Sequence, residues 1–322
     1  MKAIVFDRYG PPEVLRHTEI PDPVPAEGEV LVRVKAVSLN KADLIMMRGE
    51  PTLMRLAFGL RAPRVKILGR AIAGVVEALG PNTDGFKEGD EVLAEVDQRG
   101  FAELVATPAK FLVAIPPGVG FERAAALPVA ATTALQGLRV GRVADGHRVL
   151  VNGASGGVGT FLVQLAKALG ASEVTGVCSA RNAETVASIG ADRVVDYSRE
   201  DFTRTESGYD AVLDVVSNHP LGATRRVLRP GGVYVACGGR SDNFSGPMPR
   251  LLKMAVTSPF VKQRLRNLLA LRNGDDLAFV AALVAEGKVE PVIERTGTLA
   301  DIPEEIRRLE TEHARGKVVL TV

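Results

Sequence analysis

The glycine-rich turn Asn152–Gly159 is the feature that most constrains how this chain folds. It reads Asn-Gly-Ala-Ser-Gly-Gly-Val-Gly and lies between an apolar strand expected at Arg148–Asn152 and a helix expected at Val158–Leu169. The helix is expected because apolar residues recur at helical spacing up to Gly170. A strand, a glycine turn and a helix in this order form the context of the dinucleotide-binding fingerprint. The alternative is a plain glycine-rich turn in another βαβ fold.

Each position of this turn has a predicted task. Gly156 would let the main chain approach a pyrophosphate, and Gly159 would let the helix pack close to the strand. The helix N-terminus offers N–H groups and a partial positive charge to phosphates. The predicted cofactor-binding residues here are Ala154, which replaces the first fingerprint glycine, Ser155, Gly156, Gly157, Val158 and Gly159.

Strands and helices alternate around this turn. Further strands are expected at Val174–Cys178, Arg193–Val195, Tyr209–Val216 and Val233–Cys237, with helices at Asn182–Ile189 and before Arg229–Gly232. Short links between such elements imply right-handed crossovers and a parallel sheet. We therefore predict an α/β fold with a doubly wound, Rossmann-type sheet over residues 125–272.

The residues before this region have a different pattern. Short apolar strands are expected at Lys2–Phe6, Glu29–Val37, Ala73–Leu79, Glu91–Val96 and Phe101–Ala106, with Gly and Pro turns between them. This pattern predicts a β-barrel-like domain over residues 1–124. The tail 273–322, with helices at Asp276–Glu286 and Pro303–Ala314 and a strand at Lys317–Val322, is expected to complete it.

Composition excludes several classes of protein. A net charge of +2 in 322 residues is too small for a nucleic-acid footprint. Two cysteines, Cys178 and Cys237, cannot form a four-thiolate zinc site, and the four histidines show no ligand spacing. No apolar run is long enough to span a membrane, and the N-terminus lacks an export signal, so a cytoplasmic location is expected.

The end of the second Rossmann strand indicates which cofactor binds. An NAD site usually places an acid there, but this chain reads Cys178-Ser179-Ala180-Arg181-Asn182. Ser179 and Arg181 could instead hold a 2′-phosphate, which predicts NADPH. The alternative is that Arg181 is a solvated residue at a helix start.

Several motifs in their order and spacing resemble the medium-chain dehydrogenase/reductase superfamily, in its zinc-independent, quinone-oxidoreductase-like branch. The resemblance covers essentially the whole chain. The motifs that carry it are Ser38–Asp43, Leu68-Gly69, Ala73–Val76, Phe86–Val92, Gly100–Glu103, Ala126–Pro128, Thr133–Leu138, Ala154–Gly159, Gly190–Asp192 and Gly316–Val319.

The resemblance implies a GroES-like β-barrel catalytic domain beside the Rossmann domain. It also implies a homodimer, expected through the segment Val233–Leu271. Zinc-dependent relatives carry Cys near Lys41 and Gly-His-Glu where this chain has Gly69-Arg70-Ala71, so no metal is expected. Ala71 stands where close relatives often have Asp.

Individual residues take roles from the same resemblance. Asn40 and Thr133 would act at the nicotinamide, Tyr197 near the 2′-phosphate, and Val216, Cys237, Gly238 and Lys317 along the cofactor. Each role has a simpler alternative. Asn40 could be a turn residue, Thr133 a helix residue bonded to its own backbone, Tyr197 a core aromatic and Lys317 a strand-edge lysine. Asp43 is expected to cap the following segment, and Cys237 to be a small buried residue rather than a nucleophile.

The expected reaction is hydride transfer from NADPH to quinones or α,β-unsaturated carbonyls, whose developing negative charge needs hydrogen-bond donors rather than a metal. One alternative is a non-enzymatic NADP-binding redox sensor or crystallin-like protein. Another is an enoyl-thioester reductase, disfavoured because Leu44–Pro51 contains no tyrosine. The basic segment Arg250–Arg266 is expected to be a helical insertion over the cleft rather than a membrane-surface helix.

Overall fold

The computed structural model describes residues 1–238, 246, 248–312 and 315–322. Packing contacts divide the chain into two compact units. The first unit comprises Met1–Thr132, Arg272–Gly287 and Ile293–Val322, and the second comprises Thr133–Leu271 and Lys288–Val292.

The boundaries of these units differ in two places from the predicted domain limits, which lie between residues 124 and 125 and between residues 272 and 273. The first boundary falls after Thr132, because the buried residues Ala124–Leu127 pack with the strands of the first unit. The segment Lys288–Val292 belongs to the second unit. There Gln164 holds the main chain of Glu290 through a pair of hydrogen bonds of 2.7 and 2.9 Å.

The second unit contains a six-stranded parallel sheet with the order β10-β9-β8-β11-β12-β13. The strands are β8 (Arg148–Asn152), β9 (Glu173–Cys178), β10 (Arg193–Asp196), β11 (Tyr209–Asp214), β12 (Leu228–Ala236) and β13 (Arg264–Asn267). β8, the first strand of this unit in the sequence, lies inside the sheet. The chain adds β9 and β10 on one side of β8 and then β11, β12 and β13 on the other, so the direction of winding reverses between β8 and β11. This is the doubly wound order, so the predicted parallel sheet is confirmed.

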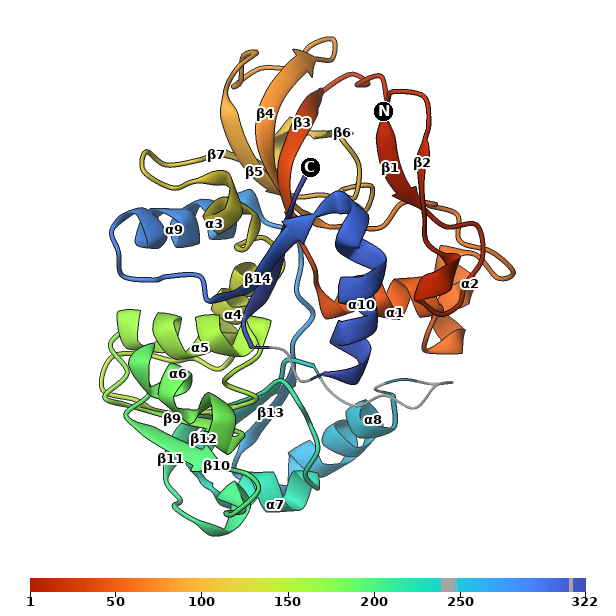
Figure 1. The fold of residues 1–322 in the computed structure, drawn as a ribbon. Coiled ribbons are helices and arrows are strands. Elements are labelled where there is room, and N and C mark those ends of the chain that lie inside the picture. Colours follow the sequence, from red (N-terminus) through yellow and green to blue (C-terminus); the bar gives the residue numbers. More distant parts are fainter. Residues whose placement is uncertain (239–245, 247, 313–314) are drawn as a thin grey trace. The chain divides into compact units, whose positions relative to one another are not determined.

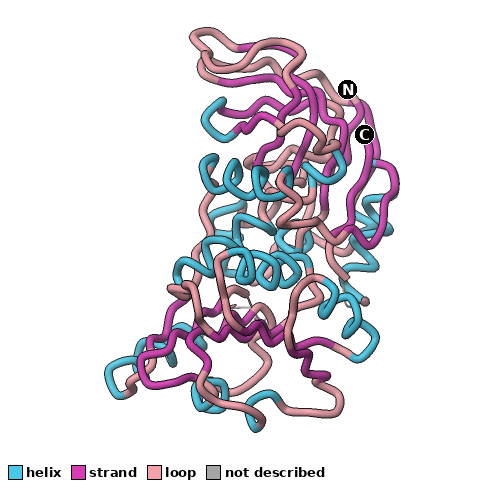
Figure 2. The backbone as a smooth tube through the Cα atoms, turned by 90° about the vertical axis from the view of Figure 1, so that its left-hand side faces the viewer, coloured by secondary structure: helices cyan, strands magenta, loops and turns pink. Residues whose placement is uncertain are grey.

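Helices lie on both sides of this sheet (Figure 2). They are α4 (Ala130–Val140), α5 (Gly157–Ala168), α6 (Ala183–Ser188), α7 (Leu221–Arg226) and α8 (Met248–Thr257). The central strands are rich in Val, Leu and Ala because both of their faces are covered. Val149, Leu150, Val151, Val212 and Leu213 have no exposed surface.

Two predictions in this unit are wrong. Arg229–Gly232 does not end a helix; α7 ends at Arg226, and these residues lie inside β12. Pro230 cannot continue a helix, and Gly231, at φ +83°, bends the strand where its register with β11 shifts. The segment Arg250–Arg266 is not one helical insertion, because it contains α8 and then enters the edge strand β13.

The first unit is built on a mostly antiparallel seven-stranded sheet. Its order is β14-β15-β3-β4-β5-β7, and β6 also pairs with β3. The strands are β3 (Glu29–Ser38), β4 (Ala71–Leu79), β5 (Glu91–Glu95), β6 (Leu104–Pro108), β7 (Leu112–Ala114), β14 (Ile293–Thr298) and β15 (Lys317–Thr321). A separate hairpin pairs β1 (Lys2–Val5) with β2 (Arg16–Glu19). Only β14 and β15 pair in parallel in the described sheet.

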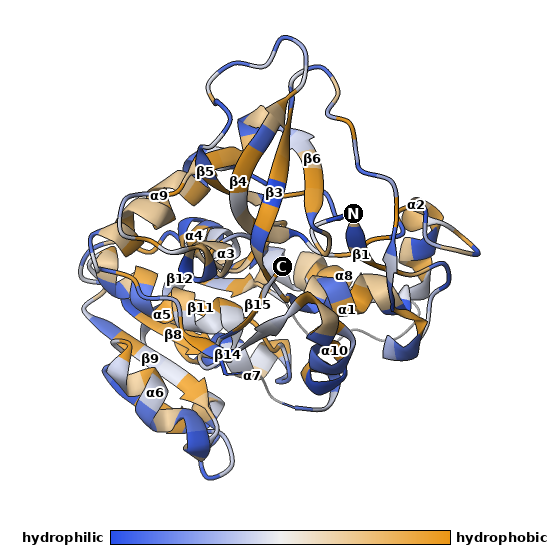
Figure 3. Ribbon diagram, turned by 45° about the horizontal axis from the view of Figure 1, so that its top comes forward, coloured by the Kyte–Doolittle hydropathy of each residue, from blue (hydrophilic) through white to orange (hydrophobic). Residues whose placement is uncertain are grey.

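The helices of this unit are α1 (Lys41–Arg48), α2 (Arg55–Phe58), α3 (Phe121–Ala125), α9 (Gly274–Ala285) and α10 (Ile302–Thr311) (Figure 1). Single 3-10 turns lie in the first unit at Pro12–Val14, Thr52–Met54, Ala109–Phe111 and Leu299–Asp301. In the second unit they lie at Ala180–Asn182, Phe202–Arg204 and Ser258–Phe260. In α10, Ile302 and Ile306 are buried, and hydrophilic residues colour much of the helix in Figure 3. This helix is therefore held by one apolar stripe.

Candidate functional site

The glycine loop leaves the sheet where the direction of winding reverses. Gly153 makes the turn at φ +91°, and Gly156 is the N-cap of α5. A Cβ on Gly159 would lie 2.0 Å from the Gly153 carbonyl oxygen, so the helix packs against the strand only because no side chain is present. A Cβ on Gly156 would meet no atom closer than 3.7 Å. The packing role of Gly159 is confirmed, and Gly156 presents bare main chain to open space.

The first N–H groups of α5 have no carbonyl partner inside the helix, so they are donors for an anion. Val216 lies beside this loop, because a Cβ on Gly153 would be 2.7 Å from its Cγ2. Ala154 is fully buried, while Ser155, Gly157 and Val158 are half-buried.

The turn after β9 carries an unsatisfied polar atom. The Ser179 Oγ is buried and has no hydrogen-bond partner. Asn182, which we did not predict as a site residue, is 1% exposed and donates from Nδ2 to Ser155 Oγ at 3.0 Å. Leaving a buried polar group unpaired costs roughly 1–3 kcal/mol. An acceptor-rich ligand such as a ribose phosphate fits this turn, because it would satisfy the Ser179 hydroxyl.

Tyr197 lies next to the same turn, because its main-chain N–H donates to the Cys178 carbonyl at 3.1 Å. Its side chain is 49% exposed, so the alternative of a core aromatic is wrong. Arg181 is also exposed. The contacts predicted for Arg181 and Tyr197 with a 2′-phosphate stay predictions.

A buried polar network that sequence reasoning missed joins the carboxyl ends of the central strands. Asp214 ends β11 and is completely buried. One carboxylate oxygen accepts from Asn152 Nδ2 at 2.8 Å and from the Ser217 N–H at 2.7 Å. The other accepts from the Tyr234 hydroxyl at 2.8 Å and the Arg250 guanidinium at 3.3 Å. Only the fold brings these positions together, so no local motif marks them.

Cys237 and Gly238 lie on this network. The Cys237 N–H donates to the Asp214 carbonyl at 2.9 Å, and the Ser217 hydroxyl donates to the Gly238 carbonyl at 2.9 Å. Cys237 is half-buried rather than fully buried, and desolvation raises the pKa of its thiol to about 12, which argues against a nucleophile. Val216, Cys237 and Gly238 thus gather with the glycine loop at one edge of the sheet.

In the first unit, Asn40 lies between β3 and α1. Its main-chain N–H donates to Asp43 Oδ2 at 2.8 Å, which confirms the predicted capping by Asp43. Asp43 Oδ1 also accepts from the Gly69 N–H at 3.2 Å. The Asn40 side chain donates from Nδ2 to the Ser38 carbonyl at 3.1 Å and accepts at Oδ1 from Lys317 Nζ at 2.6 Å. Asn40 is therefore more than an ordinary turn residue.

Lys317 is not a strand-edge lysine. β15 lies between β14 and β3, and the side chain is 2% exposed. Burial lowers the pKa of Lys317 to about 8 and raises the pKa of Asp43 to about 6. Nothing in the structure tests the predicted contact of Lys317 with a cofactor.

Arg70, which by the resemblance stands where zinc-dependent relatives have a histidine, forms an ion pair. Arg70 contacts Glu95 at 2.7 Å, and burial raises the pKa of Glu95. Ala71 is fully buried in β4 and contributes no polar atom. Within residues 1–238, 246, 248–312 and 315–322, no three His, Cys, Asp or Glu side chains cluster as a metal site.

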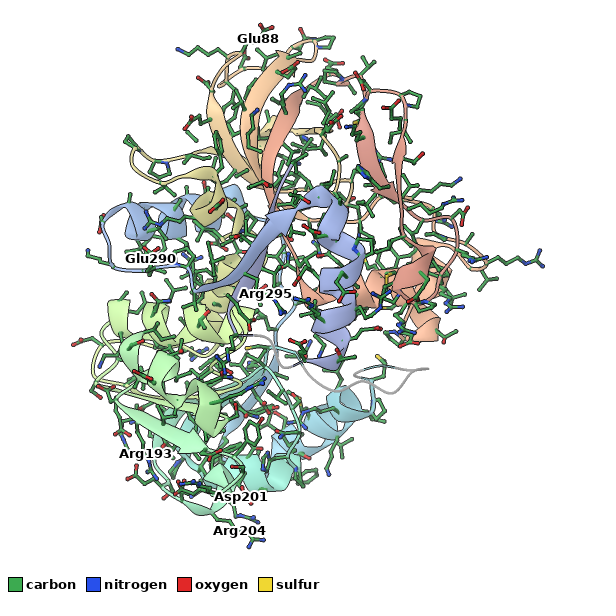
Figure 4. All side chains as sticks on the ribbon, viewed as in Figure 1. Glu88, Arg193, Asp201, Arg204, Glu290 and Arg295 are labelled. Carbon is green, nitrogen blue, oxygen red and sulfur yellow. The ribbon has the colours of Figure 1, made fainter. Side chains whose placement is uncertain are left out.

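Thr133 is half-buried in α4, and its neighbour Thr132 is the residue that bonds back to the main chain, at Val129. His219 contacts Asp201 at 3.4 Å. Asp201 and Arg204 lie on the outside of the second unit (Figure 4). His17 is exposed in β2, and His313 lies outside the described residues.

Comparisons with known proteins give the family. The family model described as "Alcohol dehydrogenase GroES-like domain" matches residues 26–117, and that described as "Zinc-binding dehydrogenase" matches residues 189–320. A chloroplastic quinone oxidoreductase of Triphysaria versicolor is 33% identical, covering 99% of this chain and 98% of that protein. This chain belongs to the quinone-oxidoreductase-like branch of the medium-chain dehydrogenase/reductase superfamily.

Two further relatives agree. The NADPH-dependent alkenal/one oxidoreductase of Arabidopsis thaliana is 32% identical, covering 99% of this chain and 79% of that protein. The structure of the quinone oxidoreductase from Coxiella burnetii is 31% identical, with a TM-score of 0.87 over 100% of this chain and 99% of that one. The Rossmann and GroES-like fold classes are thus confirmed.

As a member of this superfamily, the chain is an oxidoreductase that uses a pyridine nucleotide. In the described part of the chain, no helix has the length and apolarity to cross a membrane. The cytoplasmic location stays a prediction.

Proposed function

We propose that this protein is an NADPH-dependent, zinc-independent reductase of quinones or α,β-unsaturated carbonyls. The names of two relatives, a quinone oxidoreductase and an NADPH-dependent alkenal/one oxidoreductase, support this substrate class. The turn after β9 supports the phosphorylated cofactor, because it holds an unpaired Ser179 hydroxyl and no acid from Cys178 to Asn182.

NADPH, when bound, supplies the hydride. The residues that would hold it are those of the loop Ala154–Gly159 at the pyrophosphate and Ser179, Arg181 and Tyr197 at the 2′-phosphate. Val216, Cys237, Gly238 and Thr133 would line its nicotinamide half. The polar network around Asp214 keeps the ends of β8, β11 and β12 in fixed positions, so the strand ends would not have to reorganise when the cofactor binds.

The observation that carries the proposal is the state of the Asn40 carboxamide. Its Oδ1 is occupied by Lys317, and one Nδ2 hydrogen is occupied by Ser38. An amide nitrogen carries two hydrogens, so one N–H is left without a partner among the described residues. A quinone or enone that accepts hydride develops negative charge on oxygen, which such a fixed donor stabilises.

The test is a panel of acceptors, each monitored by loss of the reduced nicotinamide absorbance. It contains quinones, enals, enones, an enoyl thioester and simple saturated ketones, each with NADPH and with NADH. We expect turnover with quinones or enals and none with saturated ketones. Turnover of the saturated ketones alone, or of the enoyl thioester alone, would refute the proposed substrate class. NADPH binding without turnover of any acceptor would support the non-enzymatic alternative.

We also propose that the protein forms a homodimer through the segment Val233–Leu271. Within the described sheet, β13 pairs on one side only, with β12, and so leaves an open edge. Large apolar side chains in the same segment are exposed, namely Met248, Leu252, Val256, Phe260, Leu269 and Leu271 at 54–84%. Apolar surface gathered beside an open strand edge is typical of an interface between subunits.

A further inference from the structure

Lys317 is a buried amine that forms no ion pair with the described residues. Its Nζ donates to the Leu39 carbonyl at 2.9 Å and to Asn40 Oδ1 at 2.6 Å. No carboxylate of the described residues lies within ion-pair distance of it; Asp43 is the one that acts on it electrostatically. Burying an ammonium group away from a counter-charge is costly, so a lysine at this position points to a function that requires it.

The amine of Lys317 fixes the orientation of the Asn40 side-chain amide. A lysine nitrogen presents hydrogens, so the amide atom facing it at 2.6 Å has to be the oxygen. The opposite rotamer would direct the NH2 group at the ammonium and its oxygen at the Ser38 carbonyl. Both contacts would then be repulsive. Lys317 therefore fixes Nδ2 on the side of the Ser38 carbonyl, away from the amine.

Ionisable groups of opposite sign flank this amide. Lys317 contacts its oxygen, while Asp43 accepts from the Asn40 main-chain N–H. Arg70, which is paired with Glu95, also acts on Asp43. Burial moves the pKa of Asp43 to about 6 and that of Lys317 to about 8, so both groups are charged between these values.

We propose that Lys317 is a positioning residue for Asn40, whose amide it holds with Nδ2 turned away from the amine and which it polarises, when protonated, into a stronger hydrogen-bond donor. Hydrogen bonds in series strengthen one another, and a charged donor on the amide oxygen increases the positive charge on the amide hydrogens. This inference rests on the proposed function, in which Asn40 donates to the reacting oxygen.

The test is a double-mutant cycle of Asn40→Ala and Lys317→Met. Because Lys317 acts through Asn40, Lys317→Met should lower kcat about ten- to a hundred-fold in the wild type and have little effect in Asn40→Ala. Its NADPH dissociation constant, measured by fluorescence titration, should be unchanged. Lys35→Met, which removes an exposed lysine of β3, is the matched control and should keep wild-type kcat.

The pH profile separates polarisation from packing. The wild-type kcat should fall as the pH rises through about 8, where the amine loses its proton. Lys317→Gln retains a neutral donor, so it should keep part of the activity and lose this alkaline limb. An alkaline limb that persists unchanged in Lys317→Gln would overturn the polarising role.

Two further outcomes would overturn the inference. One is an equal loss of kcat on Lys317→Met in both backgrounds. The other is a weaker binding of NADPH in Lys317→Met, which would make Lys317 a cofactor-binding residue. If the wild type reduces no acceptor, the proposed function fails, but the contact between Lys317 and Asn40 can still be tested. The shift in urea midpoint caused by Lys317→Met should then differ between the wild-type and Asn40→Ala backgrounds, and an identical shift would disprove the coupling.

Discussion

Arg181 is the residue by which this chain would distinguish its two cofactors, since NADPH differs from NADH by one phosphate. A guanidinium binds phosphate through two parallel hydrogen bonds. A hydrogen bond to a charged group contributes roughly 1.5–3 kcal/mol. We therefore expect Arg181→Ala to weaken NADPH binding about ten- to a hundred-fold and to leave NADH binding nearly unchanged.

The control for this variant is Arg199→Ala, which removes an exposed arginine two residues after Tyr197 that contacts Asp196 at 3.6 Å. Both cofactors are titrated against each protein. An equal loss of affinity for NADPH and NADH, or a wild type that prefers NADH, would show that the turn after β9 does not recognise the 2′-phosphate.

The buried amine of Lys317 also sets a pH dependence of stability. Its pKa is about 8 in the folded protein and 10.5 for a lysine side chain in water, so the unfolded chain binds more protons between these values. The free energy of unfolding should therefore rise as the pH increases from 8 to 10.5, by up to about 3 kcal/mol. Below pH 8 both states hold the proton and the full cost of burial is present.

Urea unfolding from pH 7 to pH 10 measures this effect. Lys317→Met should be more stable than the wild type near neutral pH, and the difference should shrink as the pH rises. A difference that stays constant over the whole range would contradict the lowered pKa of Lys317.

At the scale of elements, the sequence identified the strands that are buried on both faces and the helices with an apolar stripe. β8 and α5 lie close to their predicted positions because Val and Leu fill the strand and glycines bound the helix. β13 was missed because Leu265 is its one buried residue, and Arg264, Arg266 and Asn267 give it the appearance of a charged surface segment. A strand at an open edge needs no apolar run, so its sequence does not reveal it.

The same limit applies to the candidate site. The glycine loop and the Ser179 turn could be predicted because each is a continuous motif whose residues act through the main chain or a neighbouring side chain. The network of Asn152, Asp214, Tyr234 and Arg250 could not, because its members come from three strands and a helix. Likewise, nothing near Lys317 in the sequence indicates that it contacts Asn40.

The junction of β8 and α5 leads to a prediction on glycines. Gly159→Ala should lower the free energy of unfolding by roughly 1–3 kcal/mol and abolish NADPH binding, because its Cβ would lie 2.0 Å from the Gly153 oxygen. The Cβ of Gly156→Ala would point into open space. This variant should therefore keep the stability of the wild type and lose only affinity for the cofactor.

Gly222→Ala is the control for both, because no atom lies within 4 Å of its Cβ position in α7. Alanine is the better helix former, so this variant should be as stable as the wild type or more stable. Thermal unfolding and NADPH titration of the three variants are the measurements. Equal stability of Gly159→Ala and Gly222→Ala would refute the close contact.

At the scale of the whole molecule, activity should not require a metal. By the resemblance, Arg70 stands in place of a histidine ligand, and it is paired with Glu95; Lys41 stands in place of a cysteine. Prolonged chelation, followed by metal analysis and an activity assay, should leave turnover unchanged. A stoichiometric zinc whose removal abolishes activity, and whose return restores it, would refute this expectation.

The proposed dimer makes a second prediction at this scale. Leu252 in α8 is 67% exposed, and Leu56 in α2 is 64% exposed. Leu252→Ser should shift the protein toward the monomer in analytical ultracentrifugation, whereas Leu56→Ser should sediment as the wild type does. A wild type that is monomeric at micromolar concentration, or a loss of the dimer in Leu56→Ser only, would place the interface elsewhere or remove it.

The position of β15 has a consequence for how the protein is made. β15 is inserted between β14 and β3, and Leu320 pairs with Val37 across nearly the entire chain. On the ribosome, the second unit, whose last segment ends at Val292, can emerge and fold while the first still lacks this strand. Asn40 precedes Lys317 in the chain, so it stays without its lysine until residue 317 has been synthesised. The amide that we assign to the reaction thus precedes its lysine by 277 residues and is among the last groups of the chain to reach its final environment.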